Sequence, residues 1–336
     1  MKIGLTLHMD ADVIPDVVAR YREQFDLVLL AEQMGLDCIW LTEHHGQIDS
    51  PTPRPELFIA HAMARTQRIK FGTAALLLGQ RAPLEIAEII SMLSVLAPQR
   101  IQIGLAKGGP FIAHQHIWAA AEQRGERLLA ALPLLKNWLK GQKVAVIEGG
   151  EPVPLVPYVS QLADTPLFVA TRDPATITQA AKLGLGLMAA QFWPVAGIRA
   201  SVAQYTIEAG KAPRLMVGRG VLIDDDEPRA RLRALAHVNQ VRARKHAAKR
   251  GGLSSLPQPS ITDATLPRGI DKITLDNIDE FALIGSVATI RARLPELSSL
   301  GVTDLALNPM TDDTSERCEQ LNLIGQLLRE FVQHHD

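Results

Sequence analysis

Three ionisable side chains follow directly after a short apolar run near the start of the chain, in the stretch IWLTEHHGQIDSP (39–51). Glu43, His44 and His45 bring a carboxylate and two imidazoles to what reads as the end of a buried strand. Imidazoles titrate near neutral pH, so this set suits proton transfer. A surface turn and a metal site are two simpler interpretations. Adjacent residues after a strand point in different directions, unlike the ligands of a helical HExxH motif, so we expect no metal.

Further polar or small residues stand at the ends of other predicted strands. In a parallel β/α barrel the active site lies at the carboxyl ends of the strands, so these residues would share one rim. Their convergence from separate parts of the chain favours a functional site over a set of unrelated turns. They are His8, Thr73, Ala74, Ala75, Lys107, Gly108, Thr171, Arg172, Asp173, Gln191, Trp193 and Asn308.

Apolar, strand-like runs alternate with amphipathic helical patterns such as 18–35, 83–97, 173–184 and 287–301. Near-continuous runs of Val, Ile and Leu indicate a parallel sheet that is covered by helices. Eight strands close a (β/α)8 barrel, so the predicted fold class is α/β with a TIM barrel. A doubly wound open sheet is the alternative, although no GxGxxG turn follows the first strand. The predicted strands are 2–8, 37–42, 69–77, 100–106, 166–170, 185–190, 214–223 and 303–308.

Two segments interrupt this alternation. Residues 141–159 alternate around Gly149 and Gly150 and indicate an inserted hairpin. Residues 251–280 are rich in Pro, Gly, Ser and Thr and lack helical periodicity, as a long loop does. We predict that this second segment is a mobile lid over the barrel mouth; a packed connection between helices is the alternative. With these insertions we expect residues 1–336 to form a single domain.

The composition is that of an ordinary globular protein, with 47% hydrophobic and 21% charged residues among 336. A formal net charge of −1 gives no reason to expect nucleic acid as a partner. The two cysteines, Cys38 and Cys318, are too far apart in the sequence to suggest a zinc–thiolate site or a disulfide framework. No run of 18 apolar residues occurs, so we expect a cytoplasmic protein without a membrane partner.

The chain resembles the bacterial luciferase-like flavin monooxygenases. The resemblance runs through 30–109, with Glu-His-His after a strand that contains Trp40, Gly-Thr-Ala-Ala at 72–75, and the helix opening Arg-x-Pro-x-x-x-Ala-Glu at 81–88. It extends to 166–194 and 284–308, and the motifs are specific when taken in order. The family's Gly-x-x-Arg-Gly turn appears here as Gly-Leu-Ala-Lys-Gly, so Lys107 stands where the family has arginine.

This resemblance implies that reduced FMN reacts with oxygen in a dry pocket to give a C4a-peroxyflavin. His44 would then transfer the proton, His45 would act with it or orient the loop, and Glu43 would bond the flavin or His44. The segment from Thr73 to Ala75 would lie against the flavin ring, where the family often has a cis peptide between the two small residues. A satisfied histidine or simple core packing is the structural alternative at each position. The expected substrate pocket comprises His8, His114 and Trp193.

The phosphate of FMN needs a cation and N–H donors. Asp173 can cap a helix that begins at Pro174, where early amides would be available and Thr176 adds a hydroxyl. Lys107 matches the family's phosphate-binding arginine but lacks its bidentate geometry, which Arg172 would compensate. The remaining residues assigned to cofactor binding are Gly108 and Thr171.

The predicted function is that of a two-component flavin-dependent monooxygenase. A separate flavin reductase would supply reduced FMN as a co-substrate, and this chain would oxygenate a small molecule that the sequence does not identify. The alternatives are a deazaflavin-dependent dehydrogenase on the same barrel and a non-catalytic flavin-binding protein. The family also implies a homodimer through the helix predicted at 55–67, although its apolar face would equally serve to cover the barrel.

Overall fold

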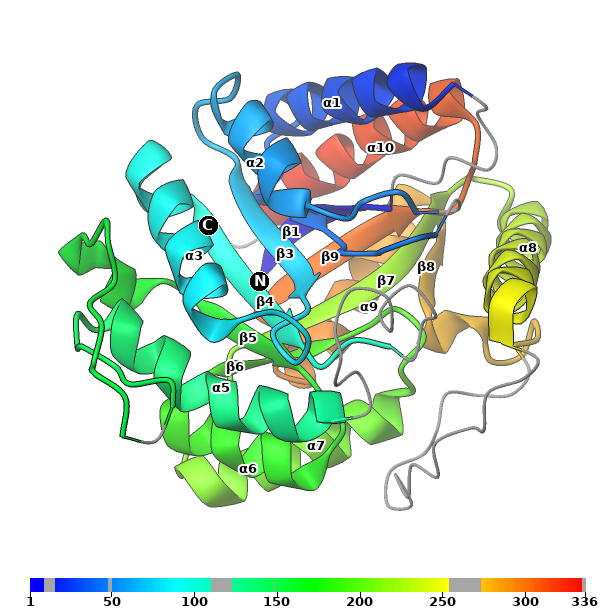
Figure 1. The fold of residues 1–336 in the computed structure, drawn as a ribbon. Coiled ribbons are helices and arrows are strands. Elements are labelled where there is room, and N and C mark those ends of the chain that lie inside the picture. Colours follow the sequence, from blue (N-terminus) through cyan, green and yellow to red (C-terminus); the bar gives the residue numbers. More distant parts are fainter. Residues whose placement is uncertain (9–15, 48–49, 110–122, 148, 254–272, 334–336) are drawn as a thin grey trace.

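The computed structural model describes residues 1–8, 16–47, 50–109, 123–147, 149–253 and 273–333 (Figure 1). Nine parallel strands form one sheet, and all eight predicted strands are among them. The strands are β1 (Lys2–Leu7), β2 (Cys38–Leu41), β3 (Lys70–Leu76), β4 (Ile101–Ala106), β5 (Leu167–Ala170), β6 (Gly186–Ala189), β7 (Leu215–Ile223), β8 (Ala282–Gly285) and β9 (Asp304–Pro309).

The sheet closes into a barrel of eight strands. Strands β1 to β6 pair in sequence order, β6 pairs with β7, β7 with β9, and β9 with β1. The closure confirms the predicted (β/α)8 barrel and excludes the open doubly wound sheet. All strands run parallel, so their carboxyl ends meet at one rim.

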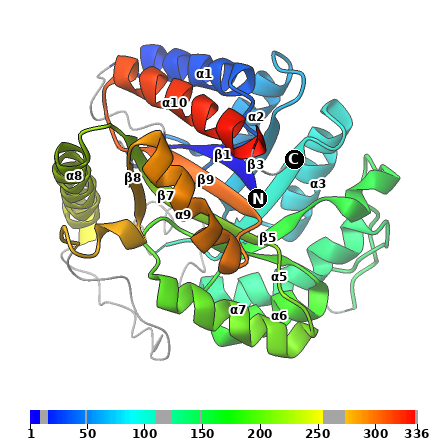
Figure 2. The ribbon, with the colours of Figure 1, turned by 180° about the vertical axis from the view of Figure 1, so that it is seen from behind.

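Helices surround the barrel on its outer side (Figures 1 and 2). Polar caps define several of them: Asp16 caps α1, Asp173 caps α6 and Ser286 caps α9, each with its side-chain oxygen accepting from early helix amides. No helix in the described part of the chain is long and apolar enough to span a membrane. The helices are α1 (Val17–Gln33), α2 (Pro55–Met63), α3 (Pro83–Leu96), α5 (Arg124–Leu139), α6 (Pro174–Leu183), α7 (Val195–Ala209), α8 (Glu227–Leu253), α9 (Val287–Ser299) and α10 (Thr314–Gln333), with 3₁₀ turns η2 (Ser160–Asp164) and η3 (Ile278–Glu280).

Strand β8 is an addition that the sequence analysis does not predict. It pairs with the second half of β7, at 220–223, whereas β6 pairs with the first half, at 215–217. Residues 220 and 221 pair with both β8 and β9, so β8 lies on the same edge of β7 as β6. A run of four residues is too short for its periodicity to separate it from the start of α9.

The two inserted segments have different outcomes. In 141–159 the chain reverses at a single antiparallel bridge between Val144 and Val153, anchored where Trp138 Nε1 donates to the Val153 carbonyl at 3.0 Å. The predicted hairpin is therefore a loop with one bridge. In 251–280, α8 extends to Leu253 and η3 ends at Glu280, while residues 254–272 of the predicted lid lie outside the described residues.

Large side chains fill the middle of the barrel interior. Trp40 and Phe168 pack edge to face, with ring centroids 5.8 Å apart, and Met188 and Met216 join the same cluster. Gly72 makes this packing possible, because a Cβ there would lie 2.2 Å from the Trp40 ring. The interior is thus solid below the rim, and any ligand space must lie above these side chains.

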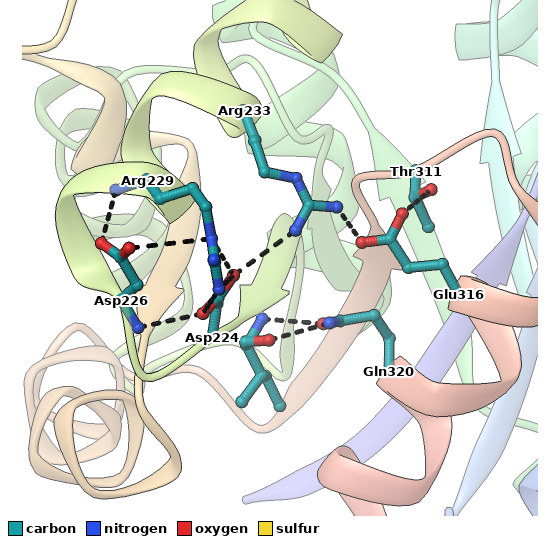
Figure 3. Close-up of polar contacts among 8 residues, drawn as sticks. Asp224, Asp226, Arg229, Arg233, Thr311, Glu316 and Gln320 are labelled. Atoms are coloured by element: carbon teal, nitrogen blue, oxygen red, sulfur yellow. Dashed lines mark hydrogen bonds and ion pairs between the residues drawn. The ribbon is translucent and has the colours of Figure 1, made fainter.

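A polar network beyond the end of β7 ties α8 to α10 (Figure 3). Arg233 lies between Asp224, at the end of the strand, and Glu316 of α10. Gln320 binds both backbone groups of Ile223, donating to its carbonyl at 2.9 Å and accepting from its amide at 2.7 Å. These contacts join α8 and α10 to the end of β7, where β8 pairs with that strand.

Candidate active site at the carboxyl ends of the strands

A cavity of about 150 Å³ lies at the carboxyl ends of the strands, within the barrel mouth. Its wall is mainly apolar and includes Met188, Met216 and Phe192. His8, a predicted pocket residue, lines it, and the carbonyl of His8 accepts from the Ser50 hydroxyl at 2.7 Å. The position agrees with the rim at which a barrel of this kind carries its active site.

Three alanines form a floor of small side chains beside the cavity. Ala74 on β3, Ala106 on β4 and Ala170 on β5 all pack on the Trp40 cluster, and Ala106 pairs with Ala170 in the sheet. The peptide bond between Ala74 and Ala75 is cis, as the resemblance leads us to expect. Thr73 does not join this floor, because its hydroxyl is buried and bonded to both backbone groups of Gly104, at 2.9 and 3.0 Å.

Glu43 is a buried carboxylate, 3% exposed, that joins the ends of β2 and β3. One oxygen lies 2.8 Å from His45 Nε2, and the other accepts from the Leu77 amide at 3.0 Å. Glu43 therefore orients His45. The expected contact of Glu43 with the flavin or with His44 stays a prediction.

Arg81 supplies the positive charge for this carboxylate. Its guanidinium is 1% exposed and lies 3.4 Å from Glu43, 2.9 Å from Glu56 and 2.8 Å from Glu85. Burial alone would lower the pKa of Arg81, but the three carboxylates outweigh it and raise that pKa. In the sequence Arg81 is distinguished only as part of a motif, whereas in the structure it is the central cation of a buried charge cluster.

His44 is half-buried, and its backbone amide donates to the Thr52 carbonyl at 3.0 Å. It lies between Glu43, which faces the Arg81 cluster, and His45, which is bonded to Glu43. Thr42, one residue before Glu43, lines the cavity and its hydroxyl is buried without a hydrogen-bond partner. The imidazoles and the cavity therefore share the end of β2.

The turn after β4 holds the predicted phosphate residues. Gly108 has a φ of +83°, and a Cβ there would lie 2.0 Å from Gln80 Nε2, so both the turn and its packing require glycine. Gln80 donates to the Lys107 carbonyl at 3.2 Å, and Arg124 Nε donates to the Gly108 carbonyl at 3.1 Å. Arg124, which the sequence analysis missed, thus brings a second cation to this turn.

The start of α6 shows the predicted cap and its consequence. One oxygen of Asp173 accepts from both the amide and the hydroxyl of Thr176, at 2.8 and 2.6 Å. Thr171 accepts from the Asp173 amide at 3.0 Å. The Asp173 carboxylate therefore already accepts from the amide and the hydroxyl of Thr176, the two groups that were predicted to bind the phosphate. Arg172 lies over the ring of Trp193, with 5.1 Å from its guanidinium carbon to the ring centroid.

Of the other predicted pocket residues, Trp193 is not among those that line this cavity. Trp193 is half-buried and packs against the main core, beside Arg172. His114 lies outside the described residues. The structure adds Arg219 of β7 to the residues that line the cavity. Gln191 and Asn308, both predicted at the rim, also line it, and Asn308 Nδ2 donates to Gln191 Oε1 at 3.2 Å.

The comparison that decides the family is the match of residues 1–304 to the luciferase-like monooxygenase model. The chain belongs to that family. The resemblance read from the motifs at 43–45, 72–75 and 81–88 is thereby confirmed.

This luciferase-like chain is 27% identical over 188 residues to the oxygenase component of a flavin-dependent trigonelline monooxygenase from Acinetobacter baylyi. The alignment covers 52% of the chain and 50% of that relative, so it spans about half the length of the relative.

Solved structures confirm the fold. Monooxygenase RslO1 from Streptomyces bottropensis has a TM-score of 0.80 at 21% identity, covering 100% of both chains. The oxygenating constituent of 3,6-diketocamphane monooxygenase from Pseudomonas putida, in complex with FMN, has a TM-score of 0.73 at 20% identity, covering 97% of both. An F420-dependent secondary alcohol dehydrogenase is also similar, with a TM-score of 0.71 at 14% identity over 98% of both chains.

Proposed function

We propose that the chain is the oxygenase of a two-component system, in which a separate reductase supplies reduced FMN and this chain adds one oxygen atom of O2 to a small organic substrate. The observation that carries the proposal is the order of groups along the rim. The Glu43–His45 pair stands at the end of β2, the alanine floor follows on β3 to β5, and the cationic turn continues from β4, the middle strand of that floor. The relative from Acinetobacter baylyi, named as an oxygenase component, supports the two-component reading.

The residues present fit FMN. The small side chains of Ala74, Ala106 and Ala170 leave room for a flat ring at the mouth, because any larger side chain there would fill that space. Lys107 and Arg124 give the adjoining turn the cations that a phosphate needs. A phosphate at α6 would compete with Asp173 for the Thr176 groups, so we assign its binding chiefly to Lys107 and the turn.

Bound FMN would supply the activation of oxygen, and the protein would control protons and water around it. Glu43 holds the His45 ring through Nε2, and the buried Arg81 guanidinium lies 3.4 Å from the other oxygen of that carboxylate. We assign the His44 imidazole the role of holding or transferring a proton at the mouth. The apolar wall formed by Met188 and Met216 excludes water from the substrate side.

The deazaflavin-dependent dehydrogenase is the second candidate, because a similar barrel carries that chemistry in the F420-dependent alcohol dehydrogenase. Anaerobic titration with FMN, reduced FMN and a deazaflavin, followed by oxygen, separates the possibilities. We expect tighter binding of reduced FMN and its rapid reoxidation by oxygen on the protein. Preference for the deazaflavin would favour the dehydrogenase, and flavin binding without accelerated reoxidation would favour a non-catalytic binding protein.

We propose further that the chain forms a homodimer through α2, whose Leu57 is 69% exposed. Leu57→Glu should convert the dimer to a monomer in multi-angle light scattering, because a carboxylate would be buried in the interface. Ile207→Glu is the matched control: Ile207 is 83% exposed on α7, at the other side of the barrel (Figure 1). Equal masses for both variants would contradict the assignment of α2.

A further inference from the structure

The turn that connects β3 to α3 holds the beginning of the turn after β4. The Gly79 amide donates to the Ala106 carbonyl at 3.1 Å, and Gln80 Nε2 donates to the Lys107 carbonyl at 3.2 Å. The two turns are in direct contact, because a Cβ at Gly79 would lie 2.8 Å from Lys107 Cα. Gln80 is 0% exposed, so water does not compete for the bond that its amide makes. Two successive carbonyls after β4 are thus fixed by two successive residues of the other turn.

The next carbonyl of the turn after β4 is held from α5. Arg124, the first residue of that helix, donates from Nε to the Gly108 carbonyl at 3.1 Å. The peptide bonds of this turn are trans, and a planar trans peptide carries its N–H opposite its C=O. Each amide of residues 107–109 therefore points away from the donor that holds the carbonyl of the same peptide unit.

This arrangement suits the binding of an anion. Gly108 has the left-handed conformation, with a φ of +83°, that occurs in turns whose successive amides bind anions. Among the described residues, none accepts a hydrogen bond from the Gly108 amide. That amide belongs to the same peptide unit as the Lys107 carbonyl, so the bond from Gln80 sets its direction.

We propose that Gln80 is a positioning residue for the phosphate of FMN, and that it thereby sets a preference of the chain for FMN over riboflavin. The inference rests on the proposed function, because it concerns the phosphate assigned there to Lys107 and its turn. Gln80 would act only through the turn, since its side chain is fully buried. A turn that is already ordered binds its ligand more tightly than one that must be ordered on binding.

A purely structural role for Gln80 leads to a different expectation. If Gln80 only packs the two turns together, its replacement disturbs the barrel mouth and lowers the affinities for FMN and riboflavin alike. If it positions the turn, only the affinity for FMN falls, because riboflavin has the same ring and ribityl chain but no phosphate. The ratio of the two affinities therefore distinguishes positioning from packing.

The test is anaerobic isothermal titration calorimetry with photoreduced FMN and photoreduced riboflavin. We expect the wild type to bind FMN about tenfold or more tightly than riboflavin, as a charge-assisted contact predicts. Gln80→Met keeps much of the side-chain volume and removes the amide. It should lower the affinity for FMN about fivefold, as loss of one neutral hydrogen bond predicts, and leave the affinity for riboflavin unchanged.

Gln102→Met is the matched control. Gln102 lies near the start of β4, is 1% exposed and accepts from Arg214 at 2.8 Å, while its Nε2 has no partner. Gln80 likewise has one bonded amide atom, and its Oε1 has no partner. The two replacements thus remove equivalent buried groups from different ends of the barrel. We expect Gln102→Met to keep the wild-type ratio of FMN to riboflavin affinity.

An affinity ratio in Gln80→Met equal to that of the wild type would overturn the proposal and leave the proposed function intact. Equal affinities of the wild type for FMN and riboflavin would overturn it as well, and no saturable binding of FMN would overturn both. If Gln80→Met does not fold, Gly108→Ala disturbs the same contact, because its Cβ would lie 2.0 Å from Gln80 Nε2. That variant should lower the ratio at least fivefold, and an unchanged ratio would count against the proposal. Reoxidation of reduced FMN is measured separately: its failure would overturn the monooxygenase assignment and leave the affinity ratio to test Gln80.

Discussion

Replacing Arg81 with methionine tests the buried charge cluster that orients His45. Arg81→Met keeps much of the side-chain volume and removes the only arginine that contacts the Glu43 carboxylate within 3.5 Å among the described residues. Glu43 and Glu56, with side chains 0% and 9% exposed, would lose their buried cation. Glu85 is 44% exposed, so its pair with Arg81 is largely screened by water.

The expected loss follows from which of these pairs are buried. Removing one partner of a buried ion pair costs about 3–5 kcal/mol, because the remaining charge is left uncompensated. The exposed Glu85 pair adds at most about 1 kcal/mol. We therefore expect Arg81→Met to lower the free energy of unfolding by about 3–5 kcal/mol near pH 7. That is a large share of the roughly 5–15 kcal/mol that stabilises a typical domain.

Urea denaturation followed by circular dichroism measures the change, through linear extrapolation to water. The matched control is Arg229→Met: Arg229 also binds a carboxylate at 2.8 Å, but its side chain is 61% exposed and the pair is screened by water, so we expect a much smaller loss than for Arg81→Met.

The double variant Arg81→Met/Glu43→Gln provides the decisive comparison. Glutamine at position 43 can still accept from the Leu77 amide but carries no charge, so it should restore part of the stability, by about 1–3 kcal/mol. Two results would refute the reasoning that balanced buried charges stabilise this cluster. One is a loss of stability in the double variant equal to the sum of the losses in the two single variants. The other is a loss in Arg81→Met no larger than the loss in Arg229→Met.

Three further perturbations test the remaining parts of the site and scaffold. Lys107→Ala should weaken FMN binding about tenfold or more in a fluorescence titration, through loss of a charge-assisted contact, whereas Lys140→Ala, at an exposed helix end, should not; equal affinities would place the phosphate elsewhere. His44→Ala should leave FMN affinity nearly unchanged but release more hydrogen peroxide per flavin oxidised, measured by peroxide assay; unchanged release would remove His44 from the chemistry. Burial raises the pKa of Glu32, but hydrogen bonds from the backbone amides at 67–69 outweigh burial and lower that pKa in the folded protein. Glu32 therefore contributes to folding stability above its unfolded-state pKa. That contribution is lost as the pH falls through the lower pKa of the folded state. Stability of the wild type should drop more steeply below about pH 4.5 than that of Glu32→Gln.

Local sequence patterns determined the barrel. Each predicted strand is a run of apolar residues, and each predicted helix has an amphipathic period or a cap, such as Asp173 before Pro174. These signals depend on neighbours within a few positions, so they can be read without knowing the fold. The order of strand and helix then left few closed arrangements, because parallel strands require crossover connections. The strand β8 was not predicted, because its four residues are too few to show a strand pattern.

The residues at the rim could also be predicted from the sequence, because strand ends could be located and a parallel barrel brings the carboxyl ends of its strands together. What they bind was decided by the tertiary structure. Glu43 pairs with Arg81, 38 positions away, and with the Leu77 amide, 34 positions away, which depends on the register of β2 against β3. At α6 the same cap that the sequence predicts engages the Thr176 groups that it also seemed to leave available.

Arg219 marks the limit of the sequence most clearly. It stands between two glycines in an otherwise apolar strand, and nothing in that local pattern states whether its charge is solvated, paired or isolated. Its burial depends on packing with segments far away in the sequence, among them the Gln191 carbonyl 28 positions before it. The cost of a buried charge arises from the absence of water and of a counter-ion, and both depend on how distant segments pack around it. The sequence thus determined which strand ends meet at the barrel mouth, and the closed barrel decided which of the side chains around it are buried and which are paired.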